Sequence, residues 1–325
     1  MRNIATFVIV VICAILFYLT FESAVDVFSV DWQLPEESDQ ELIENRLILI
    51  TQELDTPFWD KVSVGAMKQA ERDGARLEVW GSYGNNQEDF LQKIEIAIYS
   101  RVDGIIVQGL DTDEFKELTK VKASSYGIPI ITVANDVPMA ESLRRTYVGS
   151  DQYLAGEMIA RQLLTDMGTS GEVIIMLDSR QEYYQKQRLE GIQDVLKDYP
   201  NIQMIEAKTE DTREQVIAKT KDLLNRLPNV DAFIAVNANF AGDMIKEIDR
   251  RSNAEPYYIY SFDDDPESLS LLEQGKIDGM IGQSPQMMGE LSVNLMMKWL
   301  NNETVPLNLD GYLTDIRMVK AMVLQ

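Results

Sequence analysis

Polar side chains directly follow most of the predicted strands of this sequence. Carboxylates accept hydrogen bonds and carboxamides both donate and accept them, so such groups suit a ligand that carries many hydroxyls. The adjacent aromatic residues Phe58 and Trp59 add flat apolar faces, which suit the C–H face of a sugar ring. The alternative is that the polar residues only cap helices and loops, and that the aromatic pair belongs to a core. Their recurrence in both halves of the chain favours a ligand site, formed by Gln52 to Asp55, Gln108, Asn135, Asp136, Asn237, Asp263 and Gln283.

The composition removes most forms of catalysis. The 325 residues contain no histidine and one cysteine, Cys13, so the commonest general base, the usual metal ligands and any intrachain disulfide are missing. A carboxylate-based glycosidase remains an alternative, with residues 263–265 or Glu53 and Asp55 as acid and base. Consecutive acids in a strand point to opposite faces, however, which argues against a shared catalytic site at residues 263–265. The sequence also contains no EF-hand-like loop, which argues against a calcium site. We therefore expect no enzymatic activity, no cofactor and no metal site.

Strands that alternate with helices must position the polar residues. The first unit is a buried strand over 47–51, a polar loop, and a helix that starts at Pro57 with Asp55 or Thr56 as its N-cap. The alternation continues through two series of similar size, which meet at Gly149–Ser150. This pattern predicts parallel α/β sheets with right-handed crossovers. Because ligands of open parallel sheets bind at the C-terminal ends of the strands, the polar strand ends would meet there.

An apolar segment precedes the α/β part. Residues 4–21 are almost continuously apolar, and a helix of this length would reach about 27 Å, close to the hydrocarbon thickness of a bilayer. Arg2 before the segment and a series of acids after it place the N-terminus in the cytoplasm. A cleaved signal peptide and a lipoprotein signal at Cys13 are alternatives, but an uncleaved single-pass anchor at residues 1–21 fits best. Residues 22–45 then form an acidic tether to an extracytoplasmic domain.

Several longer stretches together give a family resemblance. The chain resembles the type I periplasmic sugar-binding proteins, the ribose- and galactose-binding group, which share their core with lactose-repressor-type regulators. The regulators carry a DNA-binding helix-turn-helix before this core, whereas this chain has the apolar segment and a formal net charge of −23, which argues against binding nucleic acid. The order and spacing agree over about residues 46–325, and the matching stretches are 54–59, 102–107, 127–132, 147–151 with Gly156, 188–191, 235–237, 261–263 and 282–285.

The resemblance implies two doubly wound parallel-sheet lobes joined by a hinge of three crossings, near Ser150, Gln283 and Asp310. The lobes would comprise residues 46–149 plus 284–310 and residues 150–283 plus 311–325. By matching position, the ligand would be held by Gln52, Phe58, Trp59 and Gln108 of the first lobe, by Arg188, Asn237 and Asp263 of the second, and by Gln283 at the hinge.

The sequence departs from the family pattern at three places, one of which is Ala238, where an Asp commonly follows the residue that matches Asn237. An acid common after the fourth strand is replaced by Ala134, and whether Asp136 substitutes for it is left open. The segment that begins the helix before Arg188 is unusually aromatic, so Tyr183 or Tyr184 could stack on the ligand or lie on the surface. A pentose or a hexose is therefore the first expectation, and another small polar ligand is the alternative.

The expected function is that of a membrane-anchored extracytoplasmic solute-binding protein with a monomeric binding domain. It would deliver its ligand to an ABC-type permease or report it to a membrane histidine kinase, and no feature of the sequence separates these roles. The alternatives are the glycosidase-like enzyme and a protein-interaction module on the same fold.

Overall fold

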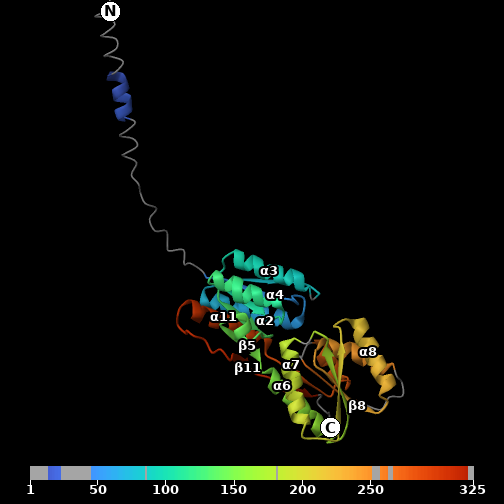
Figure 1. The fold of residues 1–325 in the computed structure, drawn as a ribbon. Helices are drawn as coiled ribbons and strands as arrows, with labels where there is room; N and C mark the ends of the chain where they lie inside the picture. Colours follow the sequence, from blue (N-terminus) through green and yellow to red (C-terminus); the bar gives the residue numbers. More distant parts are fainter. Residues whose placement is uncertain are drawn as a thin grey trace, which may run out of the picture. The chain divides into compact units, whose positions relative to one another are not determined.

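Two six-stranded sheets, each covered by its own helices, carry the fold (Figure 1). The computed structural model describes residues 14–22, 45–84, 86–180, 182–250, 257–262 and 266–320. Residues 45–325 form one compact unit, and residues 1–44 form another. The predicted α/β fold is confirmed in this larger unit, and we call each sheet with its helices a lobe.

The first lobe has the strand order β11-β5-β4-β3-β1-β2, and all neighbouring strands run parallel. Its strands are β1 (Arg46–Thr51), β2 (Arg76–Gly81), β3 (Gly104–Gln108), β4 (Ile130–Val133), β5 (Thr146–Ser150) and β11 (Tyr312–Thr314). Its helices are α2 (Pro57–Asp73), α3 (Gln87–Tyr99), α4 (Asp113–Lys116), the π-helix η1 (Glu117–Ala123), α5 (Met139–Ser142) and α11 (Pro285–Leu300).

The second lobe has the strand order β12-β10-β9-β8-β6-β7, in which only β12 runs antiparallel to its neighbour. Its strands are β6 (Gly171–Asp178), β7 (Ile202–Thr209), β8 (Val230–Ala235), β9 (Tyr258–Phe262), β10 (Gly279–Gly282) and β12 (Arg317–Lys320). Its helices are α6 (Gln152–Met167), α7 (Tyr183–Leu196), α8 (Arg213–Arg226), α9 (Asn239–Asp249) and α10 (Pro266–Glu273).

Strand β1 is buried on both faces, as its unbroken apolar sequence predicts. Leu47 and Leu49 pack in the core that includes α2 and α11, whereas Ile48 and Ile50 pack in the core that includes α3. Thr56 caps α2 by accepting a hydrogen bond from the backbone N–H of Trp59, and Pro57 occupies the first turn. The end of β1 and the start of α2 are therefore fixed relative to the sheet.

Glycines let one pair of helices in each lobe pack with their backbones in contact. A Cβ atom at Gly289 of α11 would lie 2.0 Å from the carbonyl oxygen of Val62 in α2. In the second lobe, a Cβ atom at Gly156 of α6 would lie 2.1 Å from the carbonyl oxygen of Arg188 in α7. Such distances leave no room for a side chain, so these contacts fix the positions of α2 and α7, which both carry predicted ligand-binding residues.

The last crossing between the lobes lies later than the sequence analysis expected. The expected crossing near Asp310 assigned residues 311–325 to the second lobe. In the structure, β11 pairs with β5 of the first sheet, and only β12 joins β10 of the second, so the chain crosses at residues 315–316. A strand of three residues carries too short a hydrophobic pattern to be assigned to one sheet from the sequence. The exact extent of two separately moving lobes stays a prediction.

The predicted membrane anchor lies largely outside the described residues. Residues 14–22 are helical, and residues 1–13 and most of the tether, 23–44, are among those that the structure does not describe. Within the described ranges, no helix combines the length and the apolar character needed to cross a bilayer.

Candidate functional site

A cavity of about 350 Å³ lies between the C-terminal ends of the two sheets. Its lining comes from the ends of several strands and the loops after them in both lobes, and from residues of α2, α6, α7, α9 and α10. This volume is at the small end of the range for ligand pockets, about 300–1,000 Å³. The position agrees with the rule that open parallel sheets bind ligands beyond the carboxyl ends of their strands.

The structure brings most of the predicted site residues together in the lining of this cavity. They come from both lobes and from the hinge, so that a ligand would be contacted from several sides. These residues are Gln52, Phe58, Trp59, Gln108, Asn135, Tyr184, Arg188, Asn237 and Gln283.

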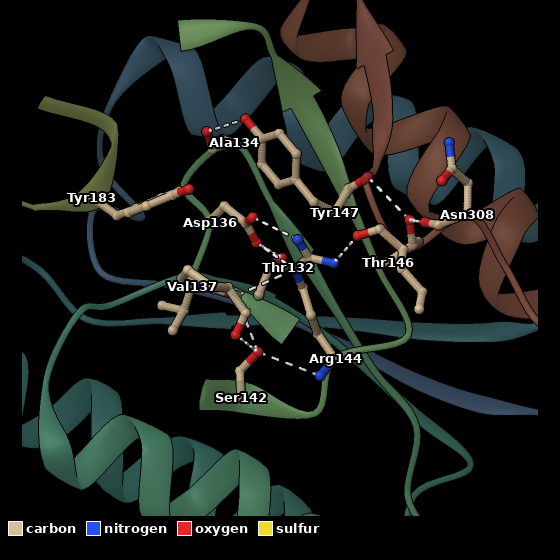
Figure 2. Close-up of polar contacts among 12 residues, drawn as sticks. Thr132, Ala134, Asp136, Val137, Ser142, Arg144, Thr146, Tyr147, Tyr183 and Asn308 are labelled. Atoms are coloured by element: carbon tan, nitrogen blue, oxygen red, sulfur yellow. Dashed lines mark hydrogen bonds and ion pairs between the residues drawn. The ribbon is translucent and has the colours of Figure 1, made fainter. Parts of the chain in front are cut away.

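Asp55 and Asp136 are predicted site residues that are not in the cavity lining, and the structure does not describe a third, Asp263. Asp55 is exposed in the turn before α2. Asp263 lies outside the described residues, in the gap between 262 and 266. Asp136 forms a buried ion pair with Arg144, in which Nε donates to Oδ1 at 2.6 Å and the second guanidinium nitrogen donates to Oδ2 at 2.7 Å (Figure 2). Asp136 is therefore engaged with Arg144 and is not among the residues that line the cavity.

The Asp136–Arg144 pair joins the loop after β4 to the segment before β11. Asp136 also accepts a hydrogen bond from the Thr132 hydroxyl at 2.6 Å, and Arg144 donates to the carbonyl oxygen of Leu309 at 2.9 Å. The pair thus has a structural role that explains an acid at this position without a ligand.

The first-lobe lining of the cavity includes a residue, Gln52, with a buried side-chain amide. Gln52 is 7% exposed, and within the part of the chain that the structure describes its Nε2 atom has no hydrogen-bond partner. The backbone N–H of Gln52 and the Thr51 hydroxyl both donate to Oε1 of Gln108 at 2.8 Å, which fixes that second amide. A buried donor without a partner costs about 1–3 kcal/mol, and a ligand oxygen would remove this cost.

The two aromatic residues of α2 have different environments. Trp59 is buried and packs in the first-lobe core as well as lining the cavity, while Phe58 is half-buried. Their rings meet edge to face, with centroids 5.6 Å apart and an interplanar angle of 78°. Core packing and a cavity wall are therefore not alternatives here, because Trp59 contributes to both.

Asn135 reaches the lining through a turn with unusual backbone geometry. The preceding residue, Ala134, has a φ of 63°, a conformation that L residues other than glycine rarely adopt. The Tyr147 hydroxyl donates to the Ala134 carbonyl oxygen at 3.0 Å (Figure 2). The Gly109 N–H donates to the Asn135 carbonyl oxygen, also at 3.0 Å. These contacts hold the strained turn at the edge of the cavity.

Arg188 forms the opposite wall with its guanidinium clamped between aromatic rings. It is 3% exposed, and its guanidinium carbon lies 4.0 Å from the ring centroid of Phe262 and 4.9 Å from that of Tyr184. Its Nε donates to Oε1 of Gln152, and a second nitrogen donates to the Val236 carbonyl oxygen, both at 2.8 Å. Burial raises the pKa of Tyr184, so its phenol stays protonated at neutral pH. This wall therefore presents a fixed, planar cation.

The second-lobe wall also contains carboxylates that the sequence analysis did not single out. Asp178 ends β6, Glu182 precedes α7, and Asp211 follows β7. Asp211 accepts hydrogen bonds from the amides of Asn237 at 3.3 Å and Asn239 at 3.2 Å, and burial raises the pKa values of both Glu182 and Asp211. Asp178 and Asp211 follow predicted strands, so the strand-end rule applied to every strand could have found them. Within the described residues, no group of three acids, histidines or cysteines is arranged to hold a metal ion.

Gln283 connects the cavity to the segments in which the chain crosses between the lobes. The Ser150 hydroxyl of the first crossing donates to Oε1 of Gln283 at 2.6 Å, and the Ser284 hydroxyl donates to the Asp315 carbonyl oxygen at 2.9 Å. All three crossings between the lobes are therefore linked by hydrogen bonds next to the cavity.

Comparisons with known proteins agree with this architecture. The ribose import binding protein RbsB of Escherichia coli (strain K12) is 21% identical over 86% of this chain and 91% of its own length. The glucose-galactose binding protein GanP of Geobacillus stearothermophilus superposes with a TM-score of 0.80 at 29% identity, covering 86% of this chain and 99% of GanP. The XylFII–LytSN complex contains a chain that superposes with a TM-score of 0.75 at 26% identity, covering 86% of this chain and 98% of that one.

The family model described as the periplasmic binding protein domain matches residues 47–304. The relatives are named as binding proteins and not as enzymes, which agrees with the non-catalytic role expected from the sequence. The resemblance noted in the sequence is confirmed, and the chain belongs to the periplasmic binding protein domain family.

Proposed function

We propose that this protein is an extracytoplasmic solute-binding protein that encloses a small sugar or sugar-like ligand between its two lobes. The observation that carries the proposal is the buried, unpartnered Nε2 of Gln52, a residue in the lining of a cavity that also contains amides, carboxylates and aromatic rings. A ligand with several hydroxyls gives this donor an acceptor and also satisfies the other polar groups of the wall. The names of RbsB and GanP, which refer to ribose and to glucose and galactose, support a monosaccharide as the ligand.

The protein can serve import or sensing, and the relatives give support to both roles. RbsB is an import binding protein, which supports delivery to an ABC-type permease. XylFII is found in a complex with LytSN, which supports a role in which a chain of this fold binds a second protein. We propose a membrane histidine kinase as that partner in the sensing role. The 18-residue segment 4–21, apolar except for Thr6 and Thr20, is the basis for the proposal that the chain stays anchored in the membrane.

A thermal-shift screen of the full-length chain in detergent against pentoses, hexoses and polyols tests the proposed function. A ligand at 100 times its dissociation constant adds about 2.7 kcal/mol to the free energy of unfolding, which is a clear shift in Tm. We expect at least one monosaccharide to stabilise the protein and to be recovered chemically unchanged. If no sugar of the panel stabilises the protein, the proposed function is refuted. Release of a hydrolysis product would favour the glycosidase alternative.

Replacing Gln52 by methionine should have opposite effects on the free and the bound protein. The variant removes the buried unpartnered donor, so the free protein should be as stable as the unchanged protein or more stable. Ligand affinity should fall by about 1–3 kcal/mol, because a ligand hydroxyl loses its hydrogen bond at a buried site. Calorimetry on the variant, with the exposed Gln286→Met of α11 as a control, measures both effects. An unchanged affinity would show that Gln52 does not contact the ligand.

A further inference from the structure

Two contacts cross from one lobe to the other at the rim of the cavity, and both are made to Asp111. Asp111 lies in the loop between β3 and α4 of the first lobe. Its backbone N–H donates to Oε2 of Glu182 at 3.1 Å, and its carboxylate accepts a hydrogen bond from Nζ of Lys186 at 2.7 Å. Glu182 and Lys186 belong to the start of α7 in the second lobe. These contacts can form only when the two lobes are close together.

Charged residues of the first lobe hold the Asp111 side chain in place. Lys116 of α4 pairs with the other carboxylate oxygen of Asp111 at 2.8 Å and also with Glu141 of α5. Burial alone would raise the pKa of Asp111, but the hydrogen bonds from Lys116 and Lys186 outweigh it and lower that pKa. Asp111 is therefore an anion at neutral pH and is already oriented by its own lobe. The side chain of Asp111 is 16% exposed, whereas that of Lys186 is 48% exposed. Of the two partners of this ion pair, Lys186 therefore has more freedom to move.

The contact is also adjacent to the ligand site. Glu182 and Leu110, the residue before Asp111, both line the cavity, whereas Asp111 and Lys186 do not. The cross-lobe ion pair therefore lies just outside the volume that a ligand would fill. A ligand that draws the lobes together brings Lys186 to Asp111 without touching either side chain.

We propose that Asp111, Glu182 and Lys186 form a latch that sets the rate at which a bound ligand leaves. This inference rests on the proposed binding function. Ion pairs between partly exposed groups contribute little, so the latch alone cannot hold empty lobes closed. Once a ligand has closed the lobes, each opening must first break the latch, and the ligand dissociates more slowly. Asp111 and Lys186 are thus positioning residues and not ligand contacts.

Stopped-flow kinetics on the full-length chain with the best sugar from the screen tests the latch. Lys186→Met and Asp111→Asn should each increase the dissociation rate about two- to fivefold, as expected for a partly exposed ion pair, with little change in the association rate. The double variant should dissociate no faster than the faster single variant, because both remove the same contact. Raising the salt concentration should speed dissociation in the unchanged protein more than in Lys186→Met.

Lys68→Met is the matched control. Lys68 pairs with Glu290 at 3.2 Å and has a side-chain exposure of 47%, close to that of Lys186, but this pair joins α2 to α11 within the first lobe. The control should leave the dissociation rate unchanged. Equal effects of Lys68→Met and Lys186→Met, effects that add in the double variant, or a change confined to the association rate would each overturn the latch.

A ligand-independent measurement separates failure of the latch from failure of the proposed function. Dyes on Glu71→Cys in α2 and Ala218→Cys in α8, in a Cys13→Ser background, report the distance between the lobes by energy transfer. Lys186→Met should reduce the population of the closed form that exists without ligand, and Lys68→Met should not. If no sugar binds but this difference is present, the latch stands and the proposed ligand class fails. If sugars bind and neither rate nor distance changes, the latch is refuted and the binding function stands.

Discussion

Replacing Arg144 by methionine should lower the free energy of unfolding by about 3–5 kcal/mol, because it leaves the carboxylate of Asp136 buried without its counter-ion. The side chains of Arg144 and Asp136 are 5% and 10% exposed, and two hydrogen bonds join them (Figure 2). The variant also removes the hydrogen bond from Arg144 to the Leu309 carbonyl oxygen, which holds the segment before β11. Urea unfolding of the full-length chain, followed by circular dichroism, measures the change.

The double variant Arg144→Met with Asp136→Asn distinguishes the contribution of the ion pair to stability from that of side-chain packing. Because it removes both charges together, it should be more stable than Arg144→Met alone. The exposed Arg226→Met of α8, whose partner is Asp222 one turn away, should have an effect below about 1 kcal/mol. A loss for Arg144→Met as small as that of Arg226→Met would contradict the structural role assigned to the pair.

Replacing Arg188 by lysine should abolish most of the ligand affinity while preserving the charge. The guanidinium is planar and stacks between Phe262 and Tyr184, whereas a lysine ammonium neither stacks in this way nor reaches both Gln152 and the Val236 carbonyl oxygen. We expect the guanidinium to donate to a ligand hydroxyl, and the loss of one such charge-assisted hydrogen bond costs about 1.5–3 kcal/mol, which corresponds to roughly a 10- to 150-fold weaker affinity. Calorimetry with the best monosaccharide of the screen measures this loss.

Two further measurements make the Arg188 result interpretable. The Tm of Arg188→Lys without ligand shows whether the lobe still folds, and only a folded variant tests the site. Arg226→Met in the same lobe changes a cation that is far from the cavity lining, and it should bind sugar normally. Binding by Arg188→Lys that equals binding by the unchanged protein would show that the guanidinium only supports the wall.

Local sequence patterns were sufficient for the architecture and for several of the residues that line the cavity. The buried run of β1 and the capped start of α2 depend on neighbouring residues alone, so Gln52, Phe58 and Trp59 could be placed from the sequence. The same rule placed Asp136 in the site, because its position after β4 resembles that of other strand-end acids. In the structure Asp136 pairs with Arg144, and Arg144 in turn donates to the Leu309 carbonyl oxygen. A local sequence pattern does not predict which side chains will form these contacts.

The contacts of the latch could not be predicted from the sequence either, because they join residues of two different lobes. Asp111 and Lys186 are 75 positions apart, and neither is at a site that a strand-end rule or the family resemblance singles out. Their pairing depends on how closely the two lobes approach, which is a property of the hinge and not of either segment. Arg188, in contrast, was found through the resemblance alone, since an arginine inside a helix carries no local signal of ligand binding.

The pairing of β11 with β5 has a consequence for the order in which the protein is made. The first lobe emerges first from the ribosome, but it needs α11 to cover its core and β11 to complete its sheet, and both are near the C-terminal end of the chain. The fully buried residues of the second-lobe core all lie between residues 155 and 281, and β12 adds only partly buried side chains to it. The lobe that is translated second can therefore complete its core earlier, and a stop codon anywhere before residue 300 leaves the first lobe with an uncovered apolar face.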